Sequence, residues 1–336
     1  MKIAILNGPR DITIEDKKID KSPLLPDQIF VETELTAFKI GTDRGNYEGA
    51  EQVPGAPDYP RGVGDSNVGI VKAIGSSVTG FKMGDRVVSR APHQSEWIGD
   101  EKDSVVRVPD GVDSQDAVWA HLYTLSGLCF RKAFFQPGET VAVVGLGVLG
   151  LGAVALGNLF GGRVIALGNS PLRLKMAEVM GAKHSIMSDD QKLGDELNSI
   201  TQGRGVDLVI LAANPWPALR TAMEIVRPNG RISVVSLLGR GEEPLDFNPL
   251  AMKWFYNKGI SLIAVNGDSG YFYPNTDDHS SSWNRACDHI LSLMADGLLK
   301  PSRVTTHRLH YTELKLAYEM AYERKKDMLG VTFNWR

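Results

Sequence analysis

The sequence segment with the clearest chemistry is a glycine pattern, G-x-G-x-x-G, at residues 145–150. It directly follows the apolar run 140–144 and opens an apolar stretch that reads as a helix. Strand, glycine turn and helix N-terminus together form a binding site for a dinucleotide pyrophosphate, because the helix start carries partial positive charge. A glycine-rich turn without a ligand is the alternative. The predicted contacts are Gly145 for the turn, Gly147 for close approach of the anion, Gly150 for helix packing, and Val148 and Leu149 between them.

The end of the next predicted strand, residues 163–167, bears on which dinucleotide binds. NAD enzymes usually place an acidic residue there, about 20 residues after the glycine turn, to bond the ribose 2′-hydroxyl. Here the strand runs into Gly168, so no carboxylate repels a 2′-phosphate. We therefore expect NADP(H). Arg173 could pair with the 2′-phosphate, although a basic residue at this position also suits an exposed helix face. The expected contacts are Gly168, Asn169, Ser170 and Arg173.

Three later apolar runs, at residues 207–212, 231–236 and 260–265, read as further strands of the same sheet. Open parallel sheets bind ligands at the carboxyl ends of their strands. The residues that follow these runs are therefore candidates for lining the nicotinamide. They are Asn214, Ser236, Leu237, Val265 and Asn266.

Composition limits the remaining possibilities. The chain has 336 residues, enough for two domains, and a formal net charge of -3, which gives no strong attraction for nucleic acid or anionic lipid. No apolar run is long enough to span a membrane, and the N-terminus lacks the core of a signal peptide, so a cytoplasmic protein is expected. The two cysteines, Cys129 and Cys287, cannot form a four-thiolate zinc site.

The order of elements predicts an α/β fold. Up to about residue 115, short strand-like segments alternate with turns, which indicates a β-rich body. A helix over residues 117–134 then leads into alternating apolar strands and helices, the pattern of a doubly wound parallel sheet. We assign residues 119–282 to the dinucleotide-binding domain, and residues 1–118 with 283–336 to the β-rich domain.

Motifs in this order and spacing resemble the medium-chain dehydrogenase/reductase superfamily over nearly the whole chain. The resemblance implies a GroES-like catalytic domain, a Rossmann cofactor domain, hydride-transfer chemistry on a small molecule, and a homodimer or homotetramer. It rests on Gly41-Thr42-Asp43, on residues 64–71 (GDSNVGIV), on residues 75–87 (GSSVTGFKMGDRV), on Ser95-Glu96-Trp97, and on the closing region 299–319.

The departures from the family concern its metal. Zinc members place a thiolate where this chain has Ile40, His-Glu where it has Asp65-Ser66, and a further ligand near Ala120. Alkyl side chains cannot bind zinc, and one carboxylate is far from a tetrahedral set. The four-cysteine structural zinc lobe is also missing. We predict no zinc and a likeness to the zinc-free branches, such as the bacteriochlorophyllide dehydrogenase-like and quinone or enoyl reductase groups.

Without a metal, side chains must handle the proton and the developing charge. The resemblance nominates Thr42, which matches the hydroxyl that relays the proton in zinc members; a helix N-cap at Thr42 or Asp43 is the alternative. The resemblance also nominates His93 as a general acid or base. The alternative is a loop histidine that is hydrogen-bonded to backbone. Finally, it nominates Asp65 as a group that orients His93 or binds the substrate. The alternative is a turn residue that follows Gly64.

The function expected from these residues is zinc-independent, NADP(H)-dependent interconversion of an alcohol and a carbonyl. Reduction of an activated C=C bond is one alternative, because it needs only modest oxyanion stabilisation. A nucleotide-binding protein without catalysis is the other, since fold does not determine function.

Overall fold

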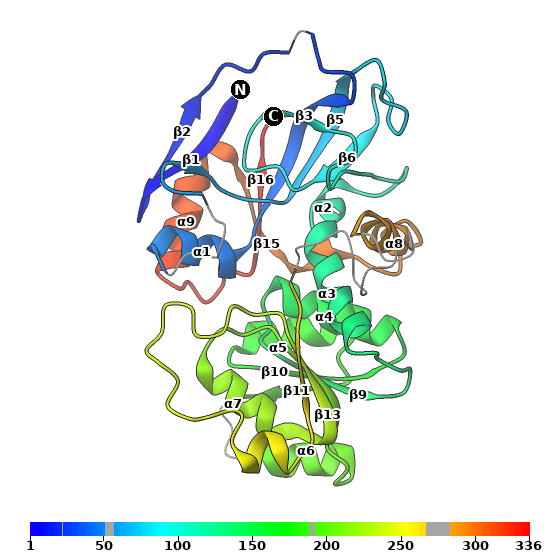
Figure 1. The fold of residues 1–336 in the computed structure, drawn as a ribbon, viewed down its shortest axis with the longest axis vertical. Helices are drawn as coiled ribbons and strands as arrows, with labels where there is room; N and C mark the ends of the chain where they lie inside the picture. Colours follow the sequence, from blue (N-terminus) through cyan, green and yellow to red (C-terminus); the bar gives the residue numbers. More distant parts are fainter. Residues whose placement is uncertain (22, 51–56, 189–191, 267–282) are drawn as a thin grey trace. The chain divides into compact units, whose positions relative to one another are not determined.

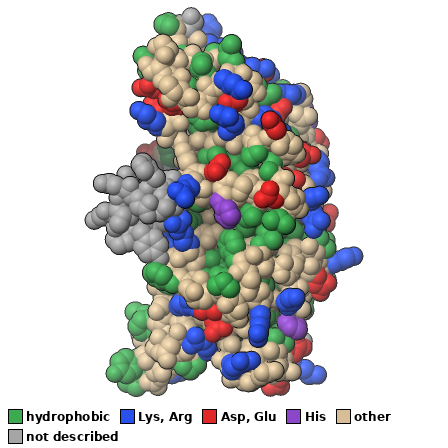
Figure 2. All heavy atoms as spheres, turned by 90° about the vertical axis from the view of Figure 1, so that its right-hand side faces the viewer, with side chains coloured by type: hydrophobic (Ala, Val, Ile, Leu, Met, Phe, Trp, Pro, Cys, Tyr) green, Lys and Arg blue, Asp and Glu red, His purple; other side chains and the backbone are tan. Residues whose placement is uncertain are grey.

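A computed structural model describes the chain except for residues 22, 51–56, 189–191 and 267–282 (Figure 1). The chain divides into two compact units, Met1–Thr124 with Ser269–Arg336, and Leu125–Asp268. The first unit is β-rich and the second holds a parallel sheet, so the predicted fold class is confirmed. On the face shown in Figure 2, acidic and basic side chains are interspersed, as a formal net charge of -3 allows.

The first unit contains two sheets. Most of its strand pairs are antiparallel, and β15 and β16 pair in parallel. The smaller sheet has the order β2 (Asp11–Asp16), β1 (Lys2–Gly8), β4 (Arg61–Gly62). The larger has the order β15 (Thr305–His310), β16 (Gly330–Asn334), β3 (Gln28–Phe38), β5 (Asn67–Ile74), β6 (Arg86–Ser89), β8 (Val106–Arg107), with β7 (Glu96–Asp100) also paired to β3.

An aromatic cluster fixes the short helix α1 (Ile40–Glu48), which follows β3 after one residue. The ring of Tyr318 on α9 (Leu314–Tyr322) packs edge-on against Phe38 at 4.6 Å and against Tyr47 at 5.3 Å between centroids. Helices α1 and α9 consequently lie side by side (Figure 1). Because such aromatic pairs are both apolar and directional, the chain around residues 39–43 is held firmly.

The second unit is built on six parallel strands in the order β11 (His184–Met187), β10 (Arg163–Gly168), β9 (Thr140–Val144), β12 (Val206–Leu211), β13 (Val226–Val234), β14 (Ser261–Ala264). In chain order this is 3-2-1-4-5-6, the order of a dinucleotide-binding sheet. Side chains of α6 (Leu193–Thr201) and α7 (Trp216–Ile225) pack on one face of the sheet in a common core cluster. Helices α4 (Val148–Leu159) and α5 (Pro171–Val179) pack against β9, β10 and β11.

Three predicted boundaries differ from the structure. The helix expected over residues 117–134 is two helices, α2 (Ser114–Ala117) and α3 (Ala120–Lys132), and the Asp113 carboxylate caps the first by accepting from the Gln115 N–H. Strand β13 ends at Val234, so the strand predicted to reach residue 236 stops earlier. Strand β11 was not predicted, because only four residues form it and the first two are a histidine and a serine. The remaining helix, α8 (Trp283–Ala295), opens the described C-terminal part of the first unit.

None of the helices in the described ranges combines the length and the apolar character that crossing a bilayer requires.

Candidate functional site

The glycine turn has the geometry that its sequence predicts. Gly145 follows β9 with φ 98°, a left-handed conformation that favours glycine. A Cβ on Gly150 would lie 1.9 Å from the Gly145 carbonyl oxygen, so only glycine fits there. Gly147 is the N-cap of α4, and a Cβ added to it would meet no atom within 4 Å. Open space therefore faces the start of α4, where unpaired N–H groups favour an anion.

The predicted residues at the strand ends lie at one edge of the sheet. Leu211 of β12 pairs with Val144 of β9 and Val234 of β13, so the residues after these strands emerge together. The Ser236 hydroxyl is buried and has no hydrogen-bond partner among the described residues. A buried hydroxyl without a partner at this edge is consistent with a polar ligand such as a carboxamide.

Other predicted residues at this edge already have local partners or are exposed. The Asn214 carbonyl accepts from the Gly239 N–H at 2.9 Å, and the Asn266 side-chain oxygen accepts from Lys132 Nζ at 3.2 Å. Leu237 is 40% exposed, whereas Val265 is buried. Their contact with a nicotinamide stays a prediction. The turn and the strand-end edge together fit a dinucleotide.

Packing at the end of β10 also favours glycine at position 168. A Cβ on Gly168 would lie 2.7 Å from the Leu146 side chain, so a larger residue there would require that buried side chain to shift. Asn169 is exposed beside it, and Ser170 is the N-cap of α5 without a side-chain cap bond. Arg173 is partly buried in the first turn of α5. The edge holds no carboxylate at residues 168–170, and the NADP(H) preference stays a prediction.

In the β-rich unit, an ion pair lies at the start of α1. Lys39 is the N-cap residue of the helix, and its ammonium pairs with the Asp65 carboxylate. The two side chains are 18% and 31% exposed. Burial acts to raise the pKa of Asp65, but the Lys39 ammonium and the Arg90 guanidinium outweigh it and hold that pKa below its usual range. Asp65 is therefore ionised at neutral pH beside a lysine.

Asp43 lies beneath this pair. Its carboxylate accepts from the Lys39 backbone N–H at 2.8 Å and lies 3.4 Å from the Tyr318 hydroxyl. Burial raises the pKa of Asp43 to about 7, and the neighbouring Asp65 charge acts in the same direction. The helix thus begins at Ile40 with Lys39 as its cap, so the alternative of Thr42 or Asp43 as N-cap is wrong. Thr42 lies in the first turn and is partly buried.

His93 is a core residue of this unit. Its side chain is fully buried, its Nδ1 lies 2.7 Å from the Thr36 hydroxyl, and its ring packs edge-on against Phe333 at 5.3 Å. Burial lowers the pKa of His93 to about 3, so the ring is neutral at pH 7. Asp65 pairs with Lys39 and has no hydrogen bond to His93. A neutral, enclosed imidazole does not suit the predicted acid–base role.

His121 lies in the same polar region. Its Nδ1 accepts from the Trp283 indole N–H at 2.7 Å, and the two rings stack at 14°. The Arg90 guanidinium lies 5.6 Å from the Trp283 ring centroid. Burial lowers the pKa of His121 to about 3, with Arg90 acting in the same direction. This histidine is therefore also neutral at pH 7.

The residues at the family's metal positions do not fit zinc. Ile40 and Ala120 carry no donor atom, and Asp65, the one carboxylate at these positions, is paired with the Lys39 ammonium. Within the described ranges, no group of three or more His, Cys, Asp or Glu side chains is placed to hold a metal ion. A cation beside the carboxylate opposes binding of a divalent ion by charge repulsion.

Lys39 is the functional candidate that sequence reasoning missed. The available signal was a lysine directly before Ile40, at the edge of the lost ligand position. Its partner Asp65 is 26 residues away in sequence, and only the structure brings the two together.

The two buried histidines predict a pH dependence of stability. In the unfolded chain a histidine titrates near 6.5, whereas His93 and His121 titrate near 3 when folded. Between these values the unfolded chain binds protons that the folded chain does not, so the free energy of unfolding falls as pH falls from 6.5. Asp43 has the opposite effect: its pKa is raised from 3.8 to about 7, so between these values the folded chain binds one proton that the unfolded chain does not.

Urea unfolding at pH 7, 5.5 and 4.5 measures this effect, with His93→Asn as the comparison variant. In the variant, the slope of the unfolding free energy against pH should decrease by the contribution of about one proton, because one of the two neutral histidines is gone. An unchanged slope would contradict the burial assigned to His93.

Comparisons with known proteins agree with this geometry. Residues 148–272 match the family described as "Zinc-binding dehydrogenase". Sorbitol dehydrogenase of Bacillus subtilis (strain 168) is 25% identical over 362 aligned residues, covering 98% of this chain and 96% of that protein. NADP-dependent isopropanol dehydrogenase of Thermoanaerobacter brockii is 32% identical over 216 residues, covering 54% of this chain and 61% of that protein.

The fold has close counterparts among solved structures. Galactitol-1-phosphate dehydrogenase from Escherichia coli superposes with a TM-score of 0.84 at 18% identity, covering 99% of this chain and 100% of that one. The two-part fold, the glycine turn and these relatives lead to one conclusion. The chain is an oxidoreductase that is similar to dehydrogenases over nearly its whole length, and its residues 148–272 resemble the family of zinc-binding dehydrogenases.

Proposed function

We propose that the protein interconverts an alcohol and a carbonyl with NADP(H) and without zinc. The observation that carries this proposal is the Lys39–Asp65 ion pair. By the resemblance to zinc members of the superfamily, Lys39 directly precedes the position of a thiolate ligand, Ile40, and Asp65 takes the position of a histidine ligand. An ammonium group can stabilise the negative charge that develops on a carbonyl oxygen during hydride transfer, the task that a Lewis acid performs in metal enzymes.

The chain's own residues have separate tasks in this reaction. NADP(H), held by the glycine turn and the start of α4, would supply the hydride for the carbonyl carbon, and the carbonyl oxygen would gain a proton from water. Lys39 donates a hydrogen bond to that oxygen, and Asp65 holds the ammonium in position. Thr42 keeps its predicted role of passing the proton. His93 has no part, because its ring is neutral and enclosed.

The cofactor preference rests on the end of β10 and on one relative. Residues 168–170 carry no carboxylate to repel a 2′-phosphate, and Arg173 lies in the following helix turn. The name of the Thermoanaerobacter brockii relative specifies NADP. A guanidinium is well suited to a phosphate because its donors form a planar fork.

Steady-state rates with NADPH and NADH test this preference. We expect kcat/KM for NADPH to exceed that for NADH by about tenfold or more, the effect of a single charged contact to the phosphate. The same assay, run with ketone, polyol and enone panels, identifies the substrate. Turnover of enones alone would replace carbonyl reduction with C=C reduction, and NADPH binding without any turnover would indicate a non-catalytic protein. A preference for NADH would contradict the cofactor assignment.

The expected homodimer or homotetramer, the cytoplasmic location and the absence of nucleic-acid and membrane partners stay predictions.

Polyol-like substrates are the first to try, since the Bacillus subtilis relative is named for sorbitol.

A further inference from the structure

The dinucleotide-binding unit has a hollow at the edge of its sheet that the proposed reaction does not use. The hollow has a volume of about 620 Å³ and lies at the amino ends of the parallel strands. The glycine turn lies at their carboxyl ends. Strand β9 begins at Thr140 beside the hollow and ends at Val144 before the turn. With a rise of about 3.3 Å per residue, the two sites are on opposite edges of the sheet.

Basic residues come to the hollow from neighbouring strands. Lys183 and His184 stand at the start of β11, Arg163 opens β10, and Arg227 lies near the start of β13. Because β11 and β10 are adjacent in the sheet, Lys183 and Arg163 reach the hollow from neighbouring strands. Arg204 approaches from the segment between α6 and β12.

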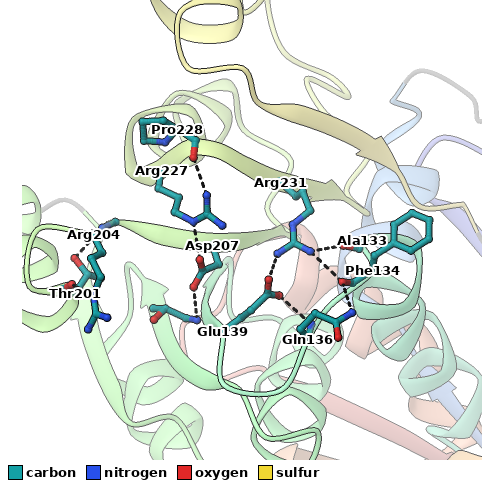
Figure 3. Close-up of polar contacts among 12 residues, drawn as sticks. Ala133, Phe134, Gln136, Glu139, Thr201, Arg204, Asp207, Arg227, Pro228 and Arg231 are labelled. Carbon is teal, nitrogen blue, oxygen red and sulfur yellow. Dashed lines mark hydrogen bonds and ion pairs between the residues drawn. The ribbon is translucent and has the colours of Figure 1, made fainter.

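The one carboxylate lining the hollow is already engaged on both oxygens. Asp207 Oδ1 pairs with Arg227 Nε at 2.6 Å, and its Oδ2 accepts from the Thr140 N–H at 2.8 Å (Figure 3). The nearby carboxylate Glu139 is paired with Arg231 and turned toward it. Neither carboxylate is therefore available to neutralise the remaining cations.

Three of the cations that line the hollow have no acidic partner among the residues that the structure describes. The Arg204 guanidinium bonds only neutral oxygens, those of the Thr201 backbone and the Gln202 side chain. Arg163 and Lys183 make no ion pair within the described ranges of the chain. Like charges gathered in one hollow repel each other and concentrate positive potential there, although the protein as a whole is anionic.

We propose that this hollow binds a small polyanion carrying at least two phosphate groups. Arg163, Lys183 and Arg204 come from three separate segments, so they can bind more than one anionic group of the same ligand. Two arginines supply the planar donor forks that suit phosphate oxygens. The volume accommodates a ligand larger than a single phosphate.

The test uses the full chain saturated with NADPH, so that the cofactor site is already filled. Inorganic pyrophosphate is titrated at physiological salt by isothermal calorimetry. We expect one site per chain, with the affinity weakened about tenfold or more in the double variant Arg163→Gln/Lys183→Gln, because charge-assisted hydrogen bonds are lost. Both side chains are exposed, so the variant should melt at the wild-type temperature. Should the double variant not fold, Arg163→Gln alone is expected to weaken binding.

Arg220→Gln is the matched control. Arg220 is a cation of the same unit, on α7 outside the hollow, and is paired with Asp246. It should leave pyrophosphate binding unchanged. Absence of binding to the wild type, release of NADPH by pyrophosphate, or equal weakening by Arg220→Gln would each overturn the proposal. None of these results bears on the oxidoreductase function, which is measured separately by turnover.

Discussion

Replacing Lys39 with methionine is expected to lower kcat for carbonyl reduction by about 100-fold or more, the effect of removing a donor that stabilises an oxyanion. Methionine has similar length and no charge, so it removes the ammonium and leaves the Asp65 carboxylate without its ion-pair partner. The aromatic cluster of Phe38, Tyr47 and Tyr318 that holds α1 is untouched. Initial rates at saturating NADPH measure the effect, and a thermal melt shows that the variant is folded.

Two variants serve as controls for Lys39→Met. Lys39→Arg keeps the positive charge and should restore part of kcat. Lys72→Met removes another lysine of the same unit, which is paired with Glu32 at 3.0 Å and 43% exposed, and should leave kcat unchanged. A Lys39→Met enzyme that keeps more than half of the wild-type kcat would exclude Lys39 from the chemistry.

The second large effect is expected at the glycine turn. Gly147→Ala should weaken NADPH binding about 100-fold or more while the unfolding temperature stays unchanged. A Cβ at this position meets no protein atom within 4 Å, and the backbone φ of -74° suits alanine. The added methyl would occupy the space through which the pyrophosphate approaches the backbone. Fluorescence titration with NADPH measures the affinity.

Gly194→Ala is the matched control for Gly147→Ala. Gly194 lies in α6 of the same unit, and its Cβ also meets nothing within 4 Å. Alanine there should leave NADPH binding unchanged. Gly150→Ala gives the contrast, because its Cβ would collide with the Gly145 carbonyl and should lower stability as well as binding. Normal NADPH affinity in Gly147→Ala would mean that the pyrophosphate does not bind at this turn.

The cofactor half of the site was largely predictable from the sequence because its signals are local. Residues 140–144 are a continuous apolar run, the turn follows immediately, and the structure places β9 and α4 within these limits. Strand, turn and helix are contiguous in the chain, so spacing alone determines their geometry. The helix over residues 117–134 was predicted less well, because no periodicity signal separates α2 from α3.

The substrate half was less predictable because its contacts are long-range. His93 is enclosed by Phe333, which is distant in the sequence, and no local pattern indicates that burial. Lys39 and Asp65 meet because β3 and β5 pair in the same sheet, which places the residues beyond their ends together. The positions at which this chain differs from the zinc members could be read directly from the sequence. The Lys39 ammonium beside Asp65 could not.

We propose that this oxidoreductase works without a metal, with an ammonium in its place. The most direct measurement is turnover of NADPH and a substrate carbonyl after exhaustive chelation, with the zinc content of the same sample determined by elemental analysis. We expect wild-type kcat with far less than one zinc per chain. Loss of activity on chelation, restored by one equivalent of zinc, would contradict it.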